Sequence, residues 1–311
     1  MKKFTLKLVW FTIPMVFFSI LGLLLPATPR ASKSLLFANQ KKDELLQHVK
    51  PPRMIFVGGS NLSFGLNSQI IKNELNIEPI NTAVHAGIGL RYMLENTIQY
   101  IKEEDIVILA LEYHHFYRDY NSTSEELLRT IFDVDPSKVK LLNFRQMIGL
   151  IPFLPKYILS KTKPSEYFNV IESDVYSVNS FNKYGDTYTH WEMESRPFKP
   201  YGSIRDQFNK SVIQNILEFQ AEVTRKGATL LVTYPGFQDI SYENSIKKIE
   251  IVSRELETKG FVTLGYPDRY KMPSDMMFDT PYHLNKEGVD HRTRLFIDDY
   301  LKLMSEKKRG M

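Results

Sequence analysis

The chain has 311 residues, of which 43% are hydrophobic and 24% are charged, so it is long enough for one large or two ordinary domains, and collagen-like, low-complexity and wholly disordered classes are excluded. Its 40 Lys and Arg residues exceed its 36 Asp and Glu residues by only four, and no stretch concentrates them, so we expect no nucleic-acid partner. The absence of cysteine excludes a disulfide scaffold, a thiolate metal site and a cysteine nucleophile.

The N-terminus carries a long apolar run. Residues 8–29 include no charged residue, and a helix of that length can cross a hydrocarbon layer of about 30 Å. Lys2, Lys3 and Lys7 precede the run, and positive charge on a short leading segment keeps that end in the cytoplasm. We therefore expect residues 1–30 to form a single-pass anchor in the cell membrane, with the rest of the chain outside the cytoplasm. A cleaved signal peptide is the alternative, although the run is longer than usual and lacks an Ala-x-Ala site.

A short amphipathic segment follows the anchor. Residues 31–52 end in Pro51-Pro52, and a proline disfavours helix geometry in the residue before it. The segment is predicted to be a stalk, and the folded domain is predicted to occupy residues 53–311.

Within the domain, apolar runs alternate with segments of helical spacing. Strands are predicted at 54–59, 79–84, 105–111, 228–234 and 261–265, and helices at 67–76, 89–104, 205–226, 242–258 and 286–304. This alternation predicts the α/β class, with a doubly wound five-stranded parallel sheet in a flavodoxin-like three-layer sandwich. In such sheets ligands bind at the carboxyl ends of the strands.

One long stretch interrupts the alternation. Residues 113–204 are too many for an ordinary loop and show no strong strand signal, so we expect an inserted cap. Within it, residues 141–159 are strongly apolar with a few basic residues, and are interrupted by Pro152 and Pro155. Two interpretations are open: a buried cap helix, or a segment lying in the membrane interface beside the anchor.

The first candidate for chemistry is Ser60, which follows the first strand directly in VGGSNLSFG. Its hydroxyl would lie on a tight turn, where Gly58 and Gly59 permit unusual backbone angles and close approach by a substrate. Backbone N–H groups of a helix starting nearby would face a developing negative charge. A nucleophilic serine with an oxyanion hole needs these features, whereas a serine that only caps a helix is the alternative.

The second candidate is the segment MFDTPYHLNKEG, at residues 277–288. It places Asp279 and His283 on a loop just before the last helix. An imidazole can take the proton of a serine, and a carboxylate can hold that imidazole in the required tautomer.

Together these motifs resemble the SGNH, or GDSL-like, hydrolase family. The likeness lies in Gly-Gly-Ser-Asn at 58–61, NTAVHAG at 81–87 and the Asp/His loop, and it covers roughly residues 53–112 and 205–304. The resemblance implies that Ser60 is the nucleophile, His283 the general base and Asp279 its orienting partner. It also implies an oxyanion hole formed by the backbone N–H groups of Ser60 and Gly87.

A closer likeness is to membrane-tethered members that modify envelope polymers, such as the alginate acetylation proteins and the D-alanyl transfer protein of lipoteichoic acid. Those proteins share the anchor and an Asp/His loop that continues as His-Leu-x-x-x-Gly, here HLNKEG at 283–288. The resemblance implies a serine acyl esterase or O-acyltransferase, most simply for acetyl, acting on an envelope or exported polysaccharide without a cofactor. If it transfers the group, a multi-spanning membrane acyl exporter is the implied partner.

Three departures from the family pattern stand out. The usual Gly-Asp-Ser is Gly-Gly-Ser, the usual Gly-x-Asn-Asp block after the third strand is replaced by LEYHHF at 111–116, and Asp279 and His283 are four apart instead of three. Without the asparagine, neighbouring polar residues are candidates for binding substrate. These candidates are Asn61, His85, Glu112, Tyr113 and His114.

Other functions are also open. The residues His85, His114 and His283 all fall near predicted strand ends, but the spacing typical of a zinc site is absent, so no metal is expected. A catalytically silent assembly or binding subunit of a polymer export complex is the main alternative to an enzyme. A lipid esterase would require an apolar lid over Ser60.

Overall fold

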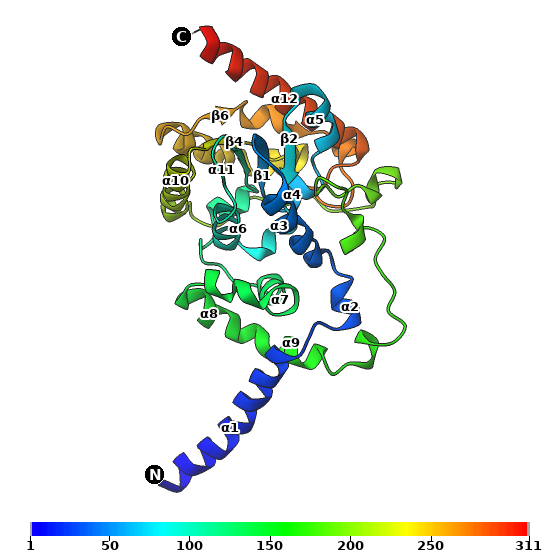
Figure 1. The fold of residues 1–311 in the computed structure, drawn as a ribbon, viewed down its shortest axis with the longest axis vertical. Helices are drawn as coiled ribbons and strands as arrows, with labels where there is room; N and C mark the ends of the chain where they lie inside the picture. Colours follow the sequence, from blue (N-terminus) through cyan, green and yellow to red (C-terminus); the bar gives the residue numbers. More distant parts are fainter. Residues whose placement is uncertain (1, 310–311) are drawn as a thin grey trace.

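A computed structural model describes residues 2–309, and it begins with a long isolated helix. Helix α1 (Lys2–Leu24) is long and apolar enough to cross a membrane. It projects away from the rest of the molecule, with its side chains almost entirely exposed (Figure 1). Both a signal sequence and a membrane anchor have these properties.

The predicted parallel sheet is confirmed. Five parallel strands lie in the order β2-β1-β3-β4-β6. Their bounds are β1 Arg53–Gly58, β2 Glu78–Asn81, β3 Ile106–Ala110, β4 Thr229–Thr233 and β6 Thr263–Leu264. The strands are almost wholly buried because both faces of the sheet are covered, which explains their continuous apolar runs. From β1 the chain goes first to β2 on one side and then to β3 on the other, so the strand order switches between β1 and β3. Ligands bind at this switch point in such folds.

Alternate side chains of the strands form two separate cores. Ile55, Val107 and Leu230 pack in the first, beneath helices α6, α10 and α11. Met54 and Ile108 pack in the second, beneath helices α5 and α12. The bounds of these helices are α5 Ser68–Leu75, α6 Leu90–Ile98, α10 Lys210–Arg225, α11 Asp239–Thr258 and α12 Lys286–Arg309. A small parallel pair, β5 (Phe237–Gln238) with β7 (Lys271–Met272), was not predicted.

The insertion between β3 and α10 is mostly short helices and loop. It contains α7 (Glu125–Arg129), α8 (Phe144–Leu150) and α9 (Leu154–Ser160), followed by a long irregular return. Helices α7, α8 and α9 lie at the end of the molecule from which α1 projects (Figure 1). Pro152 and Pro155 separate α8 from α9, because proline begins a helix more readily than it continues one.

The predicted stalk is wrong, because residues 31–52 belong to the folded domain. Helix α2 (Pro29–Ser32) and helix α3 (Ala38–His48) pack against the domain, with Leu46 fully buried in its core. The buried Lys42 ammonium donates to the backbone carbonyl of Gly185 at 2.8 Å. The Arg53 guanidinium donates to the carbonyl of Val49 at 3.3 Å, which fixes the end of α3 beside β1. Residues 31–52 are amphipathic, as predicted, but their apolar side packs into the core of this domain, so they do not form a separate stalk.

Candidate active site

A cavity of about 560 Å³ lies at the carboxyl ends of β1 and β3. It is lined by Ser60, His85, Ala86, Gly87, Glu112, His114, Arg118, Ser124, Glu126, Tyr201, Thr280, Tyr282 and His283. The structure therefore brings Ser60 and His283 together from opposite ends of the domain. Most of the lining residues have polar side chains, in contrast to the apolar lid that a lipid esterase would require.

Ser60 begins the short helix α4 (Ser60–Ser63) directly after β1. Its hydroxyl donates to Glu112 Oε1 at 3.2 Å, and the same oxygen accepts from the backbone N–H of Asn61 at 3.3 Å. A Cβ atom on Gly59 would lie 2.7 Å from that oxygen, and one on Gly58 would lie 2.3 Å from the carbonyl of Ala110. The two glycines therefore allow β3 and Glu112 to come close to β1, and neither has the positive φ that the predicted unusual backbone angles would involve.

His283 and Asp279 form a couple on the loop before α12. His283 Nδ1 lies 2.8 Å from Asp279 Oδ1, which assigns the ring proton to Nδ1 and leaves Nε2 as the basic nitrogen. The backbone N–H of His283 donates to Thr280 Oγ1 at 3.2 Å, so a turn brings the two side chains together across the four-residue spacing. The longer spacing is thus compatible with the pairing.

Tyr176, from the insertion, completes this couple. Its hydroxyl donates to Asp279 Oδ2 and lies 3.3 Å from His283 Nδ1. Burial raises the pKa of Asp279, but hydrogen bonds from His283 and Tyr176 outweigh it, and the net effect is a lowered pKa. A charged Asp279 is the form that can hold an imidazolium at His283.

The Phe64 ring packs against His283, and a second ring, His190, packs against Phe64. The Phe64 ring stacks on His283 with centroids 4.1 Å apart, and the His190 ring lies 5.0 Å from Phe64. His190 is fully buried, and its Nε2 pairs with the carbonyl of Leu284 at 3.0 Å. Burial lowers the pKa of His190 from 6.5 to about 4.

Loss of stability in acid is a consequence of that buried histidine. Between pH 6.5 and about 4 the unfolded chain binds a proton at His190 that the folded chain does not, so the free energy of unfolding falls as the pH drops through this window. The shift corresponds to about 3 kcal/mol. We expect His190→Phe to flatten the dependence of the urea midpoint on pH, whereas His291→Phe, at an exposed histidine of α12, should leave it unchanged. Equal slopes in all three proteins would contradict the assignment.

Ser60 and His283 share the cavity without a hydrogen bond between them, because the Ser60 hydroxyl is bound to Glu112. Reaction would require the hydroxyl to turn from Glu112 to His283 Nε2. The Gly87 N–H, implied for the oxyanion hole, donates to His85 Nδ1 at 3.0 Å. A Cβ on Gly87 would lie 2.9 Å from Glu126 Oε2, so this position accepts no larger residue without displacing its neighbours.

The Glu112 carboxylate accepts hydrogen bonds from both the Ser60 hydroxyl and the Asn61 N–H. In this arrangement the hydroxyl donates to Glu112 and not to His283, and a carboxylate beside it would oppose negative charge on the Ser60 oxygen.

We therefore expect Glu112→Gln to increase the rate at which a fluorophosphonate labels Ser60. Removing the charge while keeping the side-chain length should give a gain of roughly tenfold, which corresponds to about 1.4 kcal/mol. Glu126→Gln is the matched control, since Glu126 lines the same cavity without bonding to Ser60. A slower reaction in Glu112→Gln would instead indicate that Glu112 assists proton removal.

Two predicted substrate-binding residues do not line the cavity. Asn61 is fully buried, where it accepts from the Gly59 N–H at 3.2 Å and donates to the Ala110 carbonyl at 3.1 Å. It therefore ties the end of β1 to the end of β3. The Tyr113 side chain is buried in the core beside Phe237. Both residues were misassigned because residues next to the site in sequence can point into the core.

The other three candidates, His85, Glu112 and His114, do line the cavity. Burial, and then the neighbouring Arg118, lower the pKa of His114.

The sequence interpretation missed the roles of Phe64 and Tyr176. Phe64 lies only four residues after Ser60, but Tyr176 lies in the long insertion, and no spacing relates it to Asp279. Within residues 2–309, no group of three His, Asp or Glu side chains is arranged to hold a metal ion.

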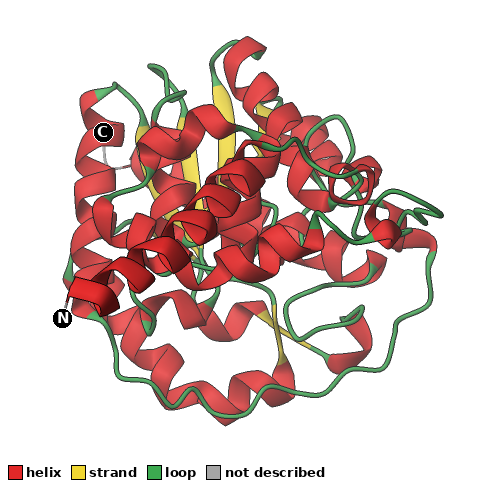
Figure 2. Ribbon diagram, turned by 90° about the horizontal axis from the view of Figure 1, so that it is seen from below, coloured by secondary structure: helices red, strands yellow, loops and turns green. Residues whose placement is uncertain are grey.

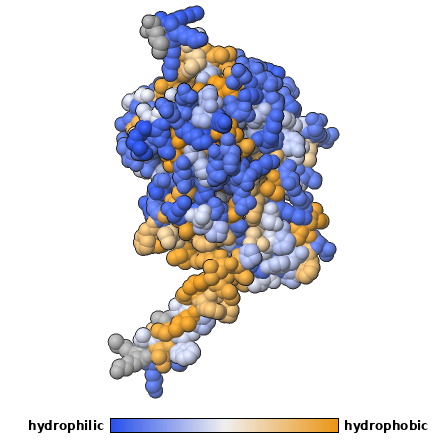
Figure 3. Space-filling view, viewed as in Figure 1, coloured by the Kyte–Doolittle hydropathy of each residue, from blue (hydrophilic) through white to orange (hydrophobic). Residues whose placement is uncertain are grey.

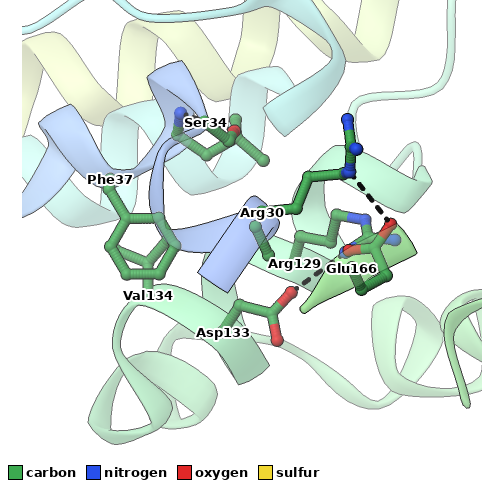
Figure 4. Close-up of a pocket in the computed structure, with 9 residues that line it drawn as sticks. Arg30, Ser34, Phe37, Arg129, Asp133, Val134 and Glu166 are labelled. Carbon is green, nitrogen blue, oxygen red and sulfur yellow. Dashed lines mark hydrogen bonds and ion pairs between the residues drawn. The ribbon is translucent and has the colours of Figure 1, made fainter. Parts of the chain in front are cut away.

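Two further cavities lie beside the Ser60 cavity. One, of about 300 Å³, shares His85 with it. The other cavity, of about 210 Å³, is shown in Figure 4. It shares Arg129 with the cavity of about 300 Å³ and extends to Arg30 of α2. Its charged groups pair with one another, Arg30 with Glu166 at 3.8 Å and Arg129 with Asp133 at 3.2 Å. The shared residues place the three cavities side by side between Ser60 and α2.

No protein-family model matches the sequence, and no curated protein matches it either. Among solved structures, the chain is similar to the YxiM protein of Bacillus subtilis, with 15% sequence identity and a TM-score of 0.38. The similar region covers 84% of this chain and 58% of the YxiM chain, so this chain spans little more than half the length of that protein.

Proposed function

We propose that the protein is a membrane-anchored serine acyl esterase or O-acyltransferase whose catalytic domain lies outside the cytoplasm. The observation that carries the proposal is the cavity at the carboxyl ends of the strands, which both Ser60 and His283 line, with His283 paired to Asp279. A hydroxyl, a basic imidazole nitrogen and an orienting carboxylate are the groups that acyl transfer through serine requires.

The proposed reaction has two steps. In the first, Ser60 Oγ turns to His283 Nε2 and attacks the carbonyl carbon of an ester, while Nε2 takes the hydroxyl proton. The tetrahedral intermediate collapses to an acyl-serine, and the leaving alcohol receives the proton from His283. In the second step, water or a sugar hydroxyl attacks the acyl-serine, His283 again takes and returns the proton, and Ser60 is regenerated.

The polymer and the partner rest on the sequence resemblance. The anchored proteins with a similar Asp/His loop modify envelope polymers, and from them we propose an acetylated or acylated envelope or exported polysaccharide as substrate. Transfer would require a supply of acyl groups from inside the cell, and a multi-spanning membrane acyl exporter would provide it. Hydrolysis would require only water in the cavity.

One observation favours a second candidate, a catalytically silent subunit of a polymer export or modification complex. The Ser60 hydroxyl is bonded to a carboxylate, and the Gly87 N–H is bonded to His85. In a silent protein these bonds would be permanent, whereas in an enzyme an ester substrate would replace both.

The test is covalent labelling of the full chain in detergent micelles by a fluorophosphonate, with peptide mapping of the labelled residue. The enzyme is expected to be labelled at Ser60 and to hydrolyse short acyl esters, acetyl esters among them. An unlabelled Ser60 together with no turnover of any ester would favour the silent subunit.

A further inference from the structure

Helices α8 and α9 expose a row of large apolar side chains. We define the α8–α9 face by Phe144, Met147, Ile148, Ile151 and Leu159, all of which are at least half exposed. A surface helix of a globular domain normally turns such residues inward. Figure 3 shows apolar residues gathered at the end of the domain beside α1, whereas most of the visible surface above them is hydrophilic.

The position of this face relative to α1 is fixed by packing. Ile158 of α9 lies against Gly22 of α1, where a Cβ atom would come within 2.6 Å of its side chain. The Lys161 ammonium, just after α9, donates to the carbonyl of Leu25 at 2.6 Å. Figure 2 views this end of the molecule from below, with α1 in front of the surrounding helices. The insertion is therefore attached to the C-terminal end of α1.

The length of α1 places that end at the edge of a bilayer. At 1.5 Å per residue, its 23 residues extend about 35 Å, slightly more than a hydrocarbon layer of about 30 Å. When α1 spans the membrane, Leu24 reaches the interface between acyl chains and headgroups. The α8–α9 face, attached there, meets the same interface.

The charge around this face fits an anionic lipid surface. Residues 136–171 contain six Lys or Arg residues and one acidic residue, Glu166, and four of the six are exposed, since Lys138 and Lys161 are buried in ion pairs with Asp43 and Asp133. Lys140 and Lys163 are exposed, and so are Arg145 and Lys156, each of which pairs with one carboxylate from elsewhere in the chain. An exposed apolar face bordered by basic residues is typical of elements that lie in a membrane interface.

We propose that the α8–α9 face is inserted in the interface of the bilayer that α1 crosses, on anionic phospholipid. This inference rests on the proposed anchoring by α1 and is independent of the acyl chemistry. It gives the domain a second attachment to the membrane, which prevents it from rotating freely about α1. The distance of the Ser60 cavity from the lipid is then fixed, as suits an enzyme whose substrate or partner is held in the same membrane.

The absence of cysteine allows a site-specific test with the full chain. Single variants Ile148→Cys and Ile151→Cys on the face would carry an NBD fluorophore. Leu301→Cys on α12 is the matched control, since Ile148 and Leu301 are both 50% exposed, and Ile13→Cys reports insertion of α1. Each labelled protein is reconstituted at low protein density in phosphatidylcholine vesicles containing phosphatidylglycerol, and is quenched either by doxyl-labelled lipid or by aqueous iodide.

The expected result is that lipid quenches the probes at 13, 148 and 151 several times more strongly than the probe at 301, with the reverse order for iodide. Lipid quenching at 13 combined with iodide quenching at 148 and 151 would overturn the proposal while leaving the anchor intact. Shielding of 148 and 151 from both quenchers would also overturn it, because a second copy or another protein would then cover the face. Iodide quenching at 13 would instead refute the anchor on which the proposal rests.

Discussion

Ser60→Ala and His283→Ala are each expected to lower kcat/KM for acetyl-ester hydrolysis by roughly four orders of magnitude. Alanine at 60 removes the atom that would carry the acyl group. Alanine at 283 removes the proposed base, whose Nδ1 is paired with Asp279, a carboxylate that also accepts from Tyr176. Because both changes disable the same step, the double variant should be no slower than either single one. Initial rates with a chromogenic acetyl ester give the measurement.

The control for this experiment is His291→Ala, which removes an exposed histidine of α12. It should retain full activity, and thermal melts should show that all variants are folded. Turnover that survives Ser60→Ala would contradict the serine mechanism. If His283→Ala remains active while Ser60→Ala does not, another group acts as the base, and Glu112, which is hydrogen-bonded to Ser60, is the first candidate.

The largest expected effect on stability belongs to the Arg53–Asp105 ion pair. Both side chains are fully buried, and Arg53 Nε lies 2.9 Å from Asp105 Oδ1. Asp105→Ala would leave the guanidinium buried without its counter-charge, so we expect the free energy of unfolding to fall by about 3–5 kcal/mol. Urea unfolding in detergent micelles, followed by circular dichroism, measures the change.

An exposed pair provides the comparison. Glu222 and Arg225 lie 2.8 Å apart on the surface of α10. Glu222→Ala should leave the free energy of unfolding nearly unchanged, because water and salt screen exposed charges. Equal effects of Asp105→Ala and Glu222→Ala would contradict the structural role assigned to Arg53, which also joins β1 to the carbonyl of Tyr100 at 2.9 Å.

Much of the fold was determined by local features of the sequence. The parallel strands were predictable because each is a short apolar run separated from the next by a helix, and burial on both faces requires such runs. The positions of Ser60 and His283 were predictable for a related reason. The carboxyl ends of parallel strands lie at the same edge of the sheet, so loops that are distant in sequence reach one cavity there. Ser60 and His283 both lie on such segments and both line the cavity.

Contacts between distant segments were decided only by the tertiary structure. Nothing local distinguishes an amphipathic stalk from α3, whose apolar side is buried by a domain that follows it in sequence. The same holds for Tyr176, which is 103 residues from the carboxylate it contacts, and for Glu112, whose hydrogen bond to Ser60 depends on two glycines allowing β1 and β3 to approach. Sequence periodicity specifies which face of an element is apolar, but the partner of that face, and the direction of each polar side chain, depend on packing in three dimensions.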